Sequence, residues 1–366
     1  MTTPSSTTTP DQPVVTNIPK TPAPLSIPID NPQTDAKVEL GKHLFFDKAL
    51  SADNSTACAS CHQVSHGFSD VTSTSVGMQQ QLHGTRNAPA LANVAYNTAF
   101  TWDGRFKSLE EHAPGPIFNS VEMGNNFSTT PRDTVPNGYN SGPGPNDTNF
   151  LFKRLDNRGK DKAGKSYPDL FMAAWGSDAI GPDGVSLDHI AKSIACFERT
   201  IISTQSTFDA YNNGDQTAYK YNPEALHGLK LFTDVNGANC VSCHSGYNFT
   251  DQQFHDNGIG INQNSDKGRF NITNNQADVG KFKTPSLRNI ALTAPYMHDG
   301  RFSTLQDVLN SYNMGGIHRT QNTDSKVKPL NLSDQDIADI IEFLKTLTDN
   351  DLAQNKANKF TNPWGN

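Results

Sequence analysis

Apolar residues recur every three or four positions in several stretches of the chain, which is the spacing of a helix with one buried face. These stretches are residues 35–46, 190–202, 222–232, 305–312 and 333–347. The last begins with Ser-Asp-Gln-Asp, a segment suited to capping a helix N-terminus. The strict alternation of apolar and polar residues that marks a strand is scarce. The pattern therefore predicts an all-α protein.

The chain contains an internal repeat. A Gly-Lys-His-Leu-Phe-Phe-Asp segment that starts at Gly41 is matched by Gly-Leu-Lys-Leu-Phe-Thr-Asp from Gly228. Further along, Trp-Asp-Gly-Arg-Phe from Trp102 is matched by His-Asp-Gly-Arg-Phe from His298. In both copies a Ser or Thr then precedes a short helical pattern, as a helix cap does. The repeat predicts two similar helical domains in tandem.

We expect these domains at residues 25–205 and 206–366. Residues 1–24 are rich in Thr, Ser and Pro and have no apolar stretch, so they are expected to be a disordered tail or tether. Segments rich in Gly, Asn and Pro at residues 129–149 and 257–280 are too long for simple connectors. We expect them to wrap a cofactor or to cover the seam between the domains.

Composition narrows the function further. Hydrophobic residues make up 34% of the 366 residues, which is low for this length and fits a core partly filled by a large apolar cofactor. The formal net charge of −7 argues against nucleic acid as a partner. No run of about 18 apolar residues is present, so no membrane span is expected.

The motif C-x-x-C-H occurs once in each half of the chain. The two copies are Cys58-Ala-Ser-Cys61-His62 and Cys240-Val-Ser-Cys243-His244. A lone C-x-x-C is equally typical of half a zinc site or of a redox dithiol. The His directly after each pair, and the repetition, favour two covalently bound c-type haems, in which the thiols form thioethers and the His binds iron from the proximal side. The fifth cysteine, Cys196, lies in a helical apolar stretch and is expected to be a buried core thiol.

Covalent haem attachment takes place outside the bacterial cytoplasm, so we expect a periplasmic or otherwise exported protein. No signal peptide is visible. The Thr/Ser/Pro-rich tail is interpreted as the tether of a mature or recombinant form, or of a lipoprotein whose lipid anchor is missing. The acidic balance of the chain suits a small redox partner with a basic face.

From about residue 35 to residue 347 the chain resembles the bacterial di-haem cytochrome c peroxidases and the related enzymes that mature the quinone cofactor of methylamine dehydrogenase. Besides the haem motifs, the resemblance rests on Arg86-Asn-Ala-Pro, Trp102-Asp-Gly-Arg, Gly115-Pro-Ile, Val121-Glu-Met123, Thr284-Pro-Ser-Leu-Arg-Asn and Leu292-Thr-Ala-Pro-Tyr-Met-His298. It implies two cytochrome c-like domains. The N-terminal haem would reduce hydrogen peroxide to water, and the C-terminal haem would take electrons from a small cytochrome c or cupredoxin and pass them across the domain seam.

The resemblance also implies roles for particular residues. Glu122 matches the distal carboxylate that moves peroxide protons, and its alternative is a surface Glu at a helix start. Pro116 matches a residue that lines the same pocket. Trp102 matches the Trp between the two haems, although an ordinary core aromatic would look the same. His112 stands where the family often has a Gln, and it is either an extra proton shuttle or a solvated His on a polar helix face.

Two further expectations concern the seam and assembly. Asn87, Thr293 and Pro295 match the residues around an interdomain calcium ion in the family. An Asn oxygen and main-chain carbonyls suit that hard cation, and with so few carboxylates the site would be modest. A homodimer is also expected.

The axial ligands opposite the proximal His residues decide what each haem does. Met297 and Met314 are the candidates at the C-terminal iron, and Met314 is preferred because it aligns with the family's axial Met and is followed by two glycines. At the N-terminal iron the family often has a His that must leave on activation. Here Met78 takes that place, and His83 is the nearest His. We therefore expect a largely open sixth position, with Met78 or His83 as alternatives.

Three functions compete. The leading hypothesis is peroxide reduction. A quinone-maturing type of protein oxidase would have a Tyr where this chain has Met314. A di-haem electron carrier without peroxidase activity would leave Glu122 without a task.

Overall fold

The computed structural model describes residues 17–365 except for 79–81, 126–150, 152–153, 180–184, 221 and 261–265. The N-terminal half contains α1 (Asp35–Phe46), α2 (Cys58–Cys61), α3 (Leu109–His112), α4 (Pro114–Phe118), α6 (Tyr167–Trp175) and α7 (Leu187–Glu198). The C-terminal half contains α8 (Thr207–Asn212), α9 (Pro223–Thr233), α10 (Phe270–Thr273), α11 (Leu305–Asn313), α12 (Asp334–Lys345) and α13 (Asn350–Ala353). Short 3-10 turns lie between them: Lys48–Leu50, Val64–His66, Val94–Tyr96, Gly176–Ala179, Cys240–Ser242, Gln276–Asp278 and Ile290–Leu292.

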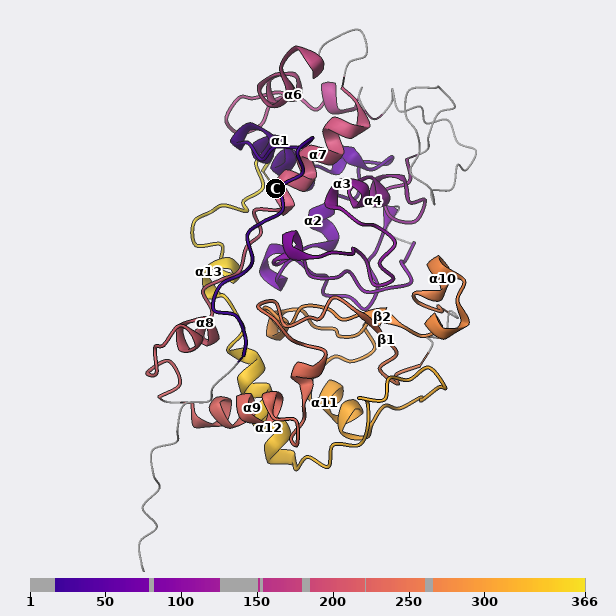
Figure 1. Cartoon of the computed structure of the whole chain (residues 1–366). Coiled ribbons are helices and arrows are strands. Elements are labelled where there is room, and N and C mark those ends of the chain that lie inside the picture. Colours follow the sequence, from indigo (N-terminus) through magenta and orange to yellow (C-terminus); the bar gives the residue numbers. More distant parts are fainter. Residues whose placement is uncertain are drawn as a thin grey trace, which may run out of the picture.

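The described residues form two helical domains, one above the other in Figure 1, and the predicted all-α class is confirmed. The strands named among them are β1 (Phe254–His255) and β2 (Phe282–Lys283), an antiparallel pair that the sequence pattern did not predict. The predicted loop 129–149 lies outside the described residues. The other predicted loop, 257–280, contains α10, and residues 261–265 of it are not described. No described helix is long and apolar enough to cross a membrane.

The repeated glycines explain how each domain closes. Gly41 in α1 lies against the backbone of α7 at Ser193, and Gly228 in α9 lies against the backbone of α12 at Asp339. At both sites a Cβ atom would overlap the facing carbonyl, so only glycine permits the approach of the two helices. The repeat therefore encodes one helix crossing, used twice.

A second repeated feature is an asparagine in each domain that hydrogen-bonds to the segment after the domain's last long helix. Asn93, in the left-handed conformation, donates its backbone N–H to the carbonyl of Ile201 (2.8 Å), and its side-chain oxygen accepts from the N–H of Ser203 (2.7 Å). Asn289 makes the same pair of bonds to the segment 347–349, at 3.0 and 2.8 Å. Asn adopts positive φ more readily than other non-glycine residues, which suits both corners.

The two ends of the chain cross between the domains. Ile18 is buried in the core of the C-terminal domain, so this part of the predicted tether is packed rather than free; residues 1–16 are not described. At the other end, Phe360 packs edge-on against Phe68 at 5.0 Å, and Trp364 donates to the carbonyl of His43. Figure 1 shows the C-terminus beside α1 and α7. The last residues thus pack on the N-terminal domain, contrary to a strictly linear division at residue 206.

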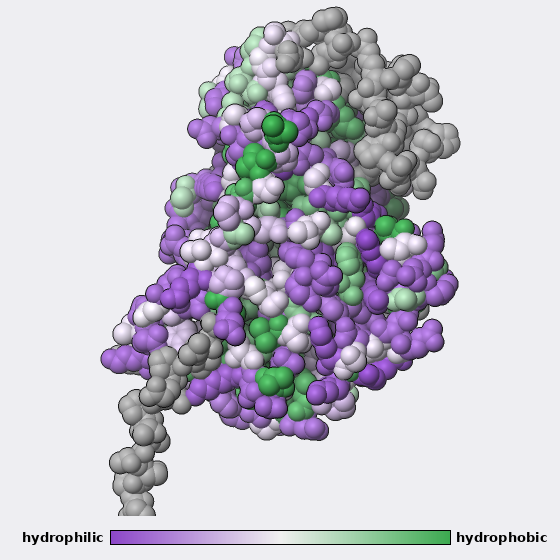
Figure 2. Space-filling model, viewed as in Figure 1, coloured by the Kyte–Doolittle hydropathy of each residue, from purple (hydrophilic) through white to green (hydrophobic). Residues whose placement is uncertain are grey.

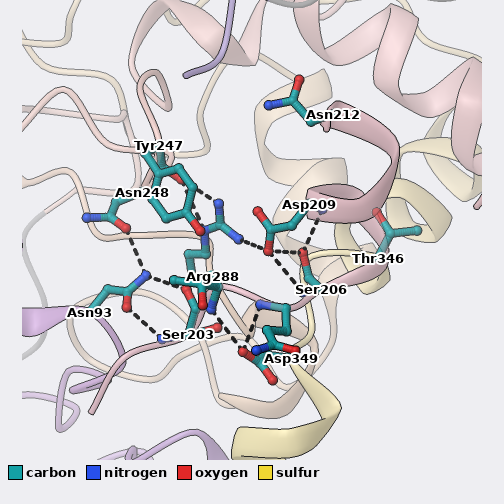
Figure 3. A network of polar contacts seen from close by, with 12 residues as sticks. Asn93, Ser203, Ser206, Asp209, Asn212, Tyr247, Asn248, Arg288, Thr346 and Asp349 are labelled. Atoms are coloured by element: carbon teal, nitrogen blue, oxygen red, sulfur yellow. Dashed lines mark hydrogen bonds and ion pairs between the residues drawn. The ribbon is translucent and has the colours of Figure 1, made fainter. Parts of the chain in front are cut away.

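Polar contacts fill the seam between the domains. Arg288 is fully buried, donates to Asp209 at 2.6 Å and to the carbonyl of Tyr247, and lies over the Tyr247 ring (Figure 3). In the same network, Asn93 of the N-terminal domain donates to the side-chain oxygen of Asn248 at 2.9 Å. Tyr247 and Asn248 closely follow the second haem motif, so the contact of Asn93 with Asn248 ties this segment to the N-terminal domain.

A second seam contact uses the Arg-Asn-Ala-Pro motif. Arg86 pairs with Asp103 of its own domain at 2.7 Å and with Asp266 of the C-terminal domain at 2.5 Å. Arg269 returns the contact by donating to the carbonyls of Asp103 and Gly104. The face of the molecule in Figure 2 is mostly polar, with small separate apolar patches.

Candidate active site

Each C-x-x-C-H motif forms a single turn, α-helical at Cys58–Cys61 and 3-10 at Cys240–Ser242. The backbone N–H of His62 donates to the carbonyl of Cys58 at 2.9 Å, and that of His244 donates to Cys240 at 2.8 Å. The four thiols are unpaired and partly buried. Cys58 lies between the two apolar clusters of the N-terminal domain, and Cys240 packs on the core of the other. One turn therefore presents two free thiols and one imidazole next to apolar core surface in each domain.

The imidazoles are prepared to bind iron. The Nδ1 of His62 lies 3.0 Å from the carbonyl oxygen of Phe68, and the Nδ1 of His244 lies 2.9 Å from that of Phe249. When Nδ1 donates to such a carbonyl, Nε2 carries the free lone pair. Burial lowers the pKa of both imidazoles, which favours the neutral form that ligates a metal. The residues present thus fit a c-type haem at each motif.

Glu122 lies close to the first motif. Asn119 donates to its Oε1 at 2.7 Å and so fixes the carboxyl group. Burial raises the pKa of Glu122, and the nearby Arg105 opposes that rise. Burial also raises the pKa of Cys61 to about 11, with a smaller contribution from the charge of Glu122. Glu122 is therefore a partly buried carboxyl group within electrostatic reach of the haem thiols, not a fully solvated surface Glu.

His112 is the last residue of α3 and lies within electrostatic reach of His62 of the first haem motif. Its ring lies between Phe100, at a centroid distance of 6.3 Å, and Phe106, at 5.4 Å. Burial, with smaller contributions from His62 and Arg105, lowers the pKa of His112 to about 4. The ring is thus neutral at physiological pH and packed between aromatics, unlike a solvated His. Pro116, in α4, lies one turn further along and is partly buried.

The two alternatives for the resting ligand separate in the structure. Met78 donates its backbone N–H to the carbonyl of Glu122 at 2.9 Å, and its thioether lies against Gly124. His83 is exposed on the surface, in a bridge with Val76. Met78 therefore lies beside Glu122, while His83 is exposed. The glutamines that separate them are not described.

One cavity runs from the second haem motif to the domain seam. Its lining includes Cys240, Cys243 and His244 at one end and Trp102, Asn87 and His112 at the other. The indole Nε1 of Trp102 donates to the carbonyl of Asn87 at 2.9 Å. The site of the C-terminal haem is thus continuous with the wall of the N-terminal domain at Trp102.

The structure places Met314, the preferred axial ligand of the C-terminal iron, away from the cavity around His244. Met314 is 59% exposed and is not part of the lining of the cavity around His244. Tyr312 and Met297 are part of it, and the side-chain amide of Asn257 lies 3.3 Å from the Tyr312 hydroxyl and 3.6 Å from the Met297 sulfur.

Helix phase is the reason. Side chains two residues apart on an α-helix point in directions that differ by about 200°. Tyr312 and Met314 therefore cannot both face the haem cavity from the end of α11. The signal was present in the sequence, because Tyr312 continues the apolar face of Leu305 and Leu309, which also line the cavity. Sequence reasoning missed Tyr312 as a site residue.

The three residues proposed for calcium are brought together. Asn87, Thr293 and Pro295 all line the seam end of the cavity. The Asn87 side-chain amide donates to the carbonyl of Thr72 at 3.1 Å, which leaves its oxygen end available as a ligand. This arrangement is compatible with a cation at the seam, and the calcium site stays a prediction.

Two neighbouring glutamates, Glu110 and Glu198, lie within electrostatic reach of each other, and Glu198 also acts on Cys58 of the first haem motif. Arg199 pairs with Glu110 at 2.6 Å, and Glu198 is buried next to them. Among the described residues, Oε2 of each glutamate and Nη1 of Arg199 have no hydrogen-bond partner. Burial raises the pKa of Glu198 to about 8.

This pair predicts a pH-dependent stability. Because the pKa of Glu198 is higher in the folded than in the unfolded protein, the native state binds the extra proton between about pH 4.5 and pH 8. The free energy of unfolding should therefore fall as pH rises through this window, by up to about 1.4 kcal/mol per pH unit. Glu198→Gln should flatten this fall in denaturant titrations, while the exposed Glu342→Gln should not. Equal slopes in wild type and Glu198→Gln would contradict the assignment.

Comparisons with known proteins agree with these sites. The profile of the di-haem cytochrome c peroxidase family matches residues 35–217, and that of cytochrome c matches residues 225–348. The methylamine utilization protein MauG of Methylorubrum extorquens is 36% identical over 320 residues, covering 87% of this chain and 80% of that protein. The cytochrome c551 peroxidase of Nitrosomonas europaea is 34% identical over 320 residues, covering 87% and 81%.

Solved structures show the same architecture. A MauG-like protein associated with microbial copper homeostasis superimposes with a TM-score of 0.79 at 29% identity, covering 95% of this chain and 99% of that one. The diheme peroxidase BthA of Burkholderia thailandensis, at 22% identity, shares the fold with a TM-score of 0.71, covering 87% of each chain. The prepared imidazoles, the paired thiols and these matches together show that the chain belongs to the di-haem cytochrome c peroxidase family and carries two c-type haems.

Proposed function

We propose that this protein reduces hydrogen peroxide to water at its N-terminal haem, using electrons that a small redox protein delivers to the C-terminal haem. The observation that carries the proposal is Glu122, a partly buried carboxyl group with a raised pKa, fixed by Asn119 near the first haem motif. A simple electron carrier has no use for an ionisable group with a raised pKa there. The peroxidase names of several relatives support the same activity.

The chain's own residues supply the proton chemistry. A haem at the first motif, held by Cys58, Cys61 and His62, supplies the iron at which the O–O bond breaks. The carboxylate of Glu122 takes the proton from one peroxide oxygen and delivers it to the departing one, a transfer that typically contributes ~10²–10⁴ in rate. Asn119 holds Oε1 in place, and Arg105 keeps the ionised form within reach by opposing the raised pKa.

Trp102 is the proposed bridge for electrons. It lines the cavity of the C-terminal haem, yet it belongs to the N-terminal domain. Its carbonyl accepts from Lys283 at 2.8 Å and its indole donates to Asn87, so both ends of the residue are fixed at the seam. A fixed aromatic between the two haems shortens the gap that an electron has to cross. We also propose the calcium ion at Asn87, Thr293 and Pro295 as a clamp on this seam.

The donor and the location follow from the haem chemistry. We propose a small cytochrome c or a cupredoxin as donor and the periplasm as the compartment, because covalent haem is attached outside the cytoplasm. The direct test is aerobic turnover: the holoprotein, given a reduced small cytochrome c, should oxidise it only when hydrogen peroxide is added. Absence of peroxide-dependent oxidation with either donor class would contradict the proposal. The homodimer stays a prediction.

A second candidate function, oxidation of a protein side chain as in quinone maturation, is favoured by Tyr312. The resemblance places the Tyr of that type at the position of Met314, whereas in this chain a Tyr two residues earlier lines the C-terminal haem cavity. MauG itself is among the relatives. The two functions differ in the ligand that they require of the C-terminal iron, so ligation separates them.

Substitution of each candidate ligand tests this. Met314→Ala should leave the optical spectrum and the midpoint potential of the C-terminal haem unchanged, because its side chain is 59% exposed. A change in Met297→Leu alone indicates a thioether ligand and electron entry, which supports peroxide reduction. A change in Tyr312→Phe alone indicates a tyrosine ligand and favours protein oxidation. A marked change in Met314→Ala would contradict the placement of Met314 outside the cavity.

A further inference from the structure

Lys283 is a buried cation without a matching anion. It is the second residue of β2, only 6% of it is exposed, and it lines the cavity that contains Cys240 and His244. Its Nζ contacts the carbonyl of Thr284 at 3.4 Å, and no carboxylate oxygen of the described residues lies within 4.0 Å of it. Burial lowers the pKa of Lys283 to about 8, against a smaller opposing effect of Asp251.

His298 presents a second unused donor to the same cavity. It is 2% exposed, and its ring stacks on Phe282, the neighbour of Lys283 in β2, at a centroid distance of 3.7 Å. Its Nε2 is buried and has no hydrogen-bond partner among the described residues; the nearest carboxylate oxygen, from Asp299, is 4.0 Å away. His298 occupies the position of the repeat that Trp102 occupies in the other domain.

The Lys283 ammonium group and the His298 Nε2 would both be satisfied by the same kind of ligand, a hydrogen-bond acceptor. A buried charge without a partner and a buried donor without an acceptor both destabilise a folded protein. A compact anion with acceptor oxygens would satisfy both. A c-type haem in this cavity brings two carboxylates of its own, the propionates, and its thioether edge is fixed at the cysteines.

We propose that Lys283 and His298 form the binding site for a propionate carboxylate of the C-terminal haem, at the seam next to Trp102. The assignment rests on the haem site and not on the proposed peroxidase activity. The backbone supports it, because the Lys283 N–H donates to the carbonyl of Trp102 and the His298 carbonyl accepts from the N–H of Asn87, both at 2.8 Å. The propionate would thus be held by the same segment that fixes the bridging Trp.

Potentiometry of the holoprotein tests the site. Removing a cation next to a propionate favours the ferric state, so Lys283→Gln should lower the midpoint potential of the C-terminal haem and leave that of the N-terminal haem unchanged. The propionate bending band in the resonance Raman spectrum should shift as well. Lys283→Arg should restore both values. Lys281→Gln is the matched control, since Lys281 loses the same charge two residues earlier but is partly exposed and paired with Asp278.

His298→Phe gives an independent measurement that keeps the stack on Phe282. It should shift the propionate band without removing a charge. Equal midpoint potentials and an unchanged propionate band in Lys283→Gln would overturn the proposal. Lys283→Gln could fail to incorporate the second haem while Lys281→Gln incorporates it normally. In that case an unchanged propionate band in His298→Phe would overturn the proposal.

Discussion

Glu122→Gln is expected to lower peroxide turnover by ~10²–10⁴, because Gln keeps the shape of the side chain but cannot carry the proton. The loss should appear in turnover at saturating donor and peroxide, since the carboxyl group acts in the bond-breaking step. Both haems should still be attached, because Glu122 contacts neither Cys nor His of the first motif by hydrogen bond in the described residues.

The matched control is Glu111→Gln. Glu111 lies in α3, near His112, but is exposed and bonds only to the N–H of Lys107 among the contacts described. It should retain wild-type turnover. Haem content and the two midpoint potentials, measured for each variant, separate a proton-transfer defect from a damaged site. Near wild-type turnover of Glu122→Gln with intact haems would remove Glu122 from the mechanism.

Arg288→Met is expected to lower the free energy of unfolding by about 3–5 kcal/mol, the cost of leaving a buried charge without its partner. Asp209 would lose a 2.6 Å ion pair, and the carbonyl of Tyr247 would lose both of its guanidinium donors. Arg288 also lies over the Phe249 ring, and the carbonyl of Phe249 holds His244. A shifted midpoint potential of the C-terminal haem should therefore accompany the lost stability.

Denaturant unfolding of the holoprotein, followed by the absorbance of each haem, measures this effect. The double variant Arg288→Met, Asp209→Asn removes both charges and should recover a large part of the loss, which distinguishes an unpaired charge from lost packing. A loss below 1 kcal/mol in the single variant would contradict the role of Arg288 as the centre of the seam network in Figure 3.

The haem sites could be predicted because their signals are local. Each C-x-x-C-H motif places two thiols and an imidazole on one turn, and the chain needs no distant contact to form it. The repeat was equally readable, and Gly41 and Gly228 now have a physical reason in the close crossing of two helices. Glu122 and Trp102 came from resemblance; Glu122 lies near the thiols of the first motif and Trp102 lines the cavity of the second, and their roles stay predictions.

The structure differs from the sequence-based expectations where contacts between distant parts of the chain determine which side chains are buried. Met314 is preferred from the sequence because it aligns with the family's axial Met and is followed by two glycines, but the register of α11 turns Tyr312 to the haem cavity and Met314 to solvent. No local pattern indicated that the chain ends cross between domains, because Phe360 meets Phe68 only in the folded protein. The burial of Lys283 was missed because a two-residue strand carries no periodicity from which to infer burial.

An electron paramagnetic resonance spectrum of the fully oxidised protein, before and after one equivalent of hydrogen peroxide, tests the central claim most directly. With Met78 beside Glu122 and His83 on the surface, the account predicts a high-spin ferric signal from the N-terminal haem. That signal should disappear on addition of peroxide without prior reduction, while the C-terminal haem gives a separate signal. Two low-spin signals that peroxide leaves unchanged would contradict a peroxidase with an open N-terminal iron.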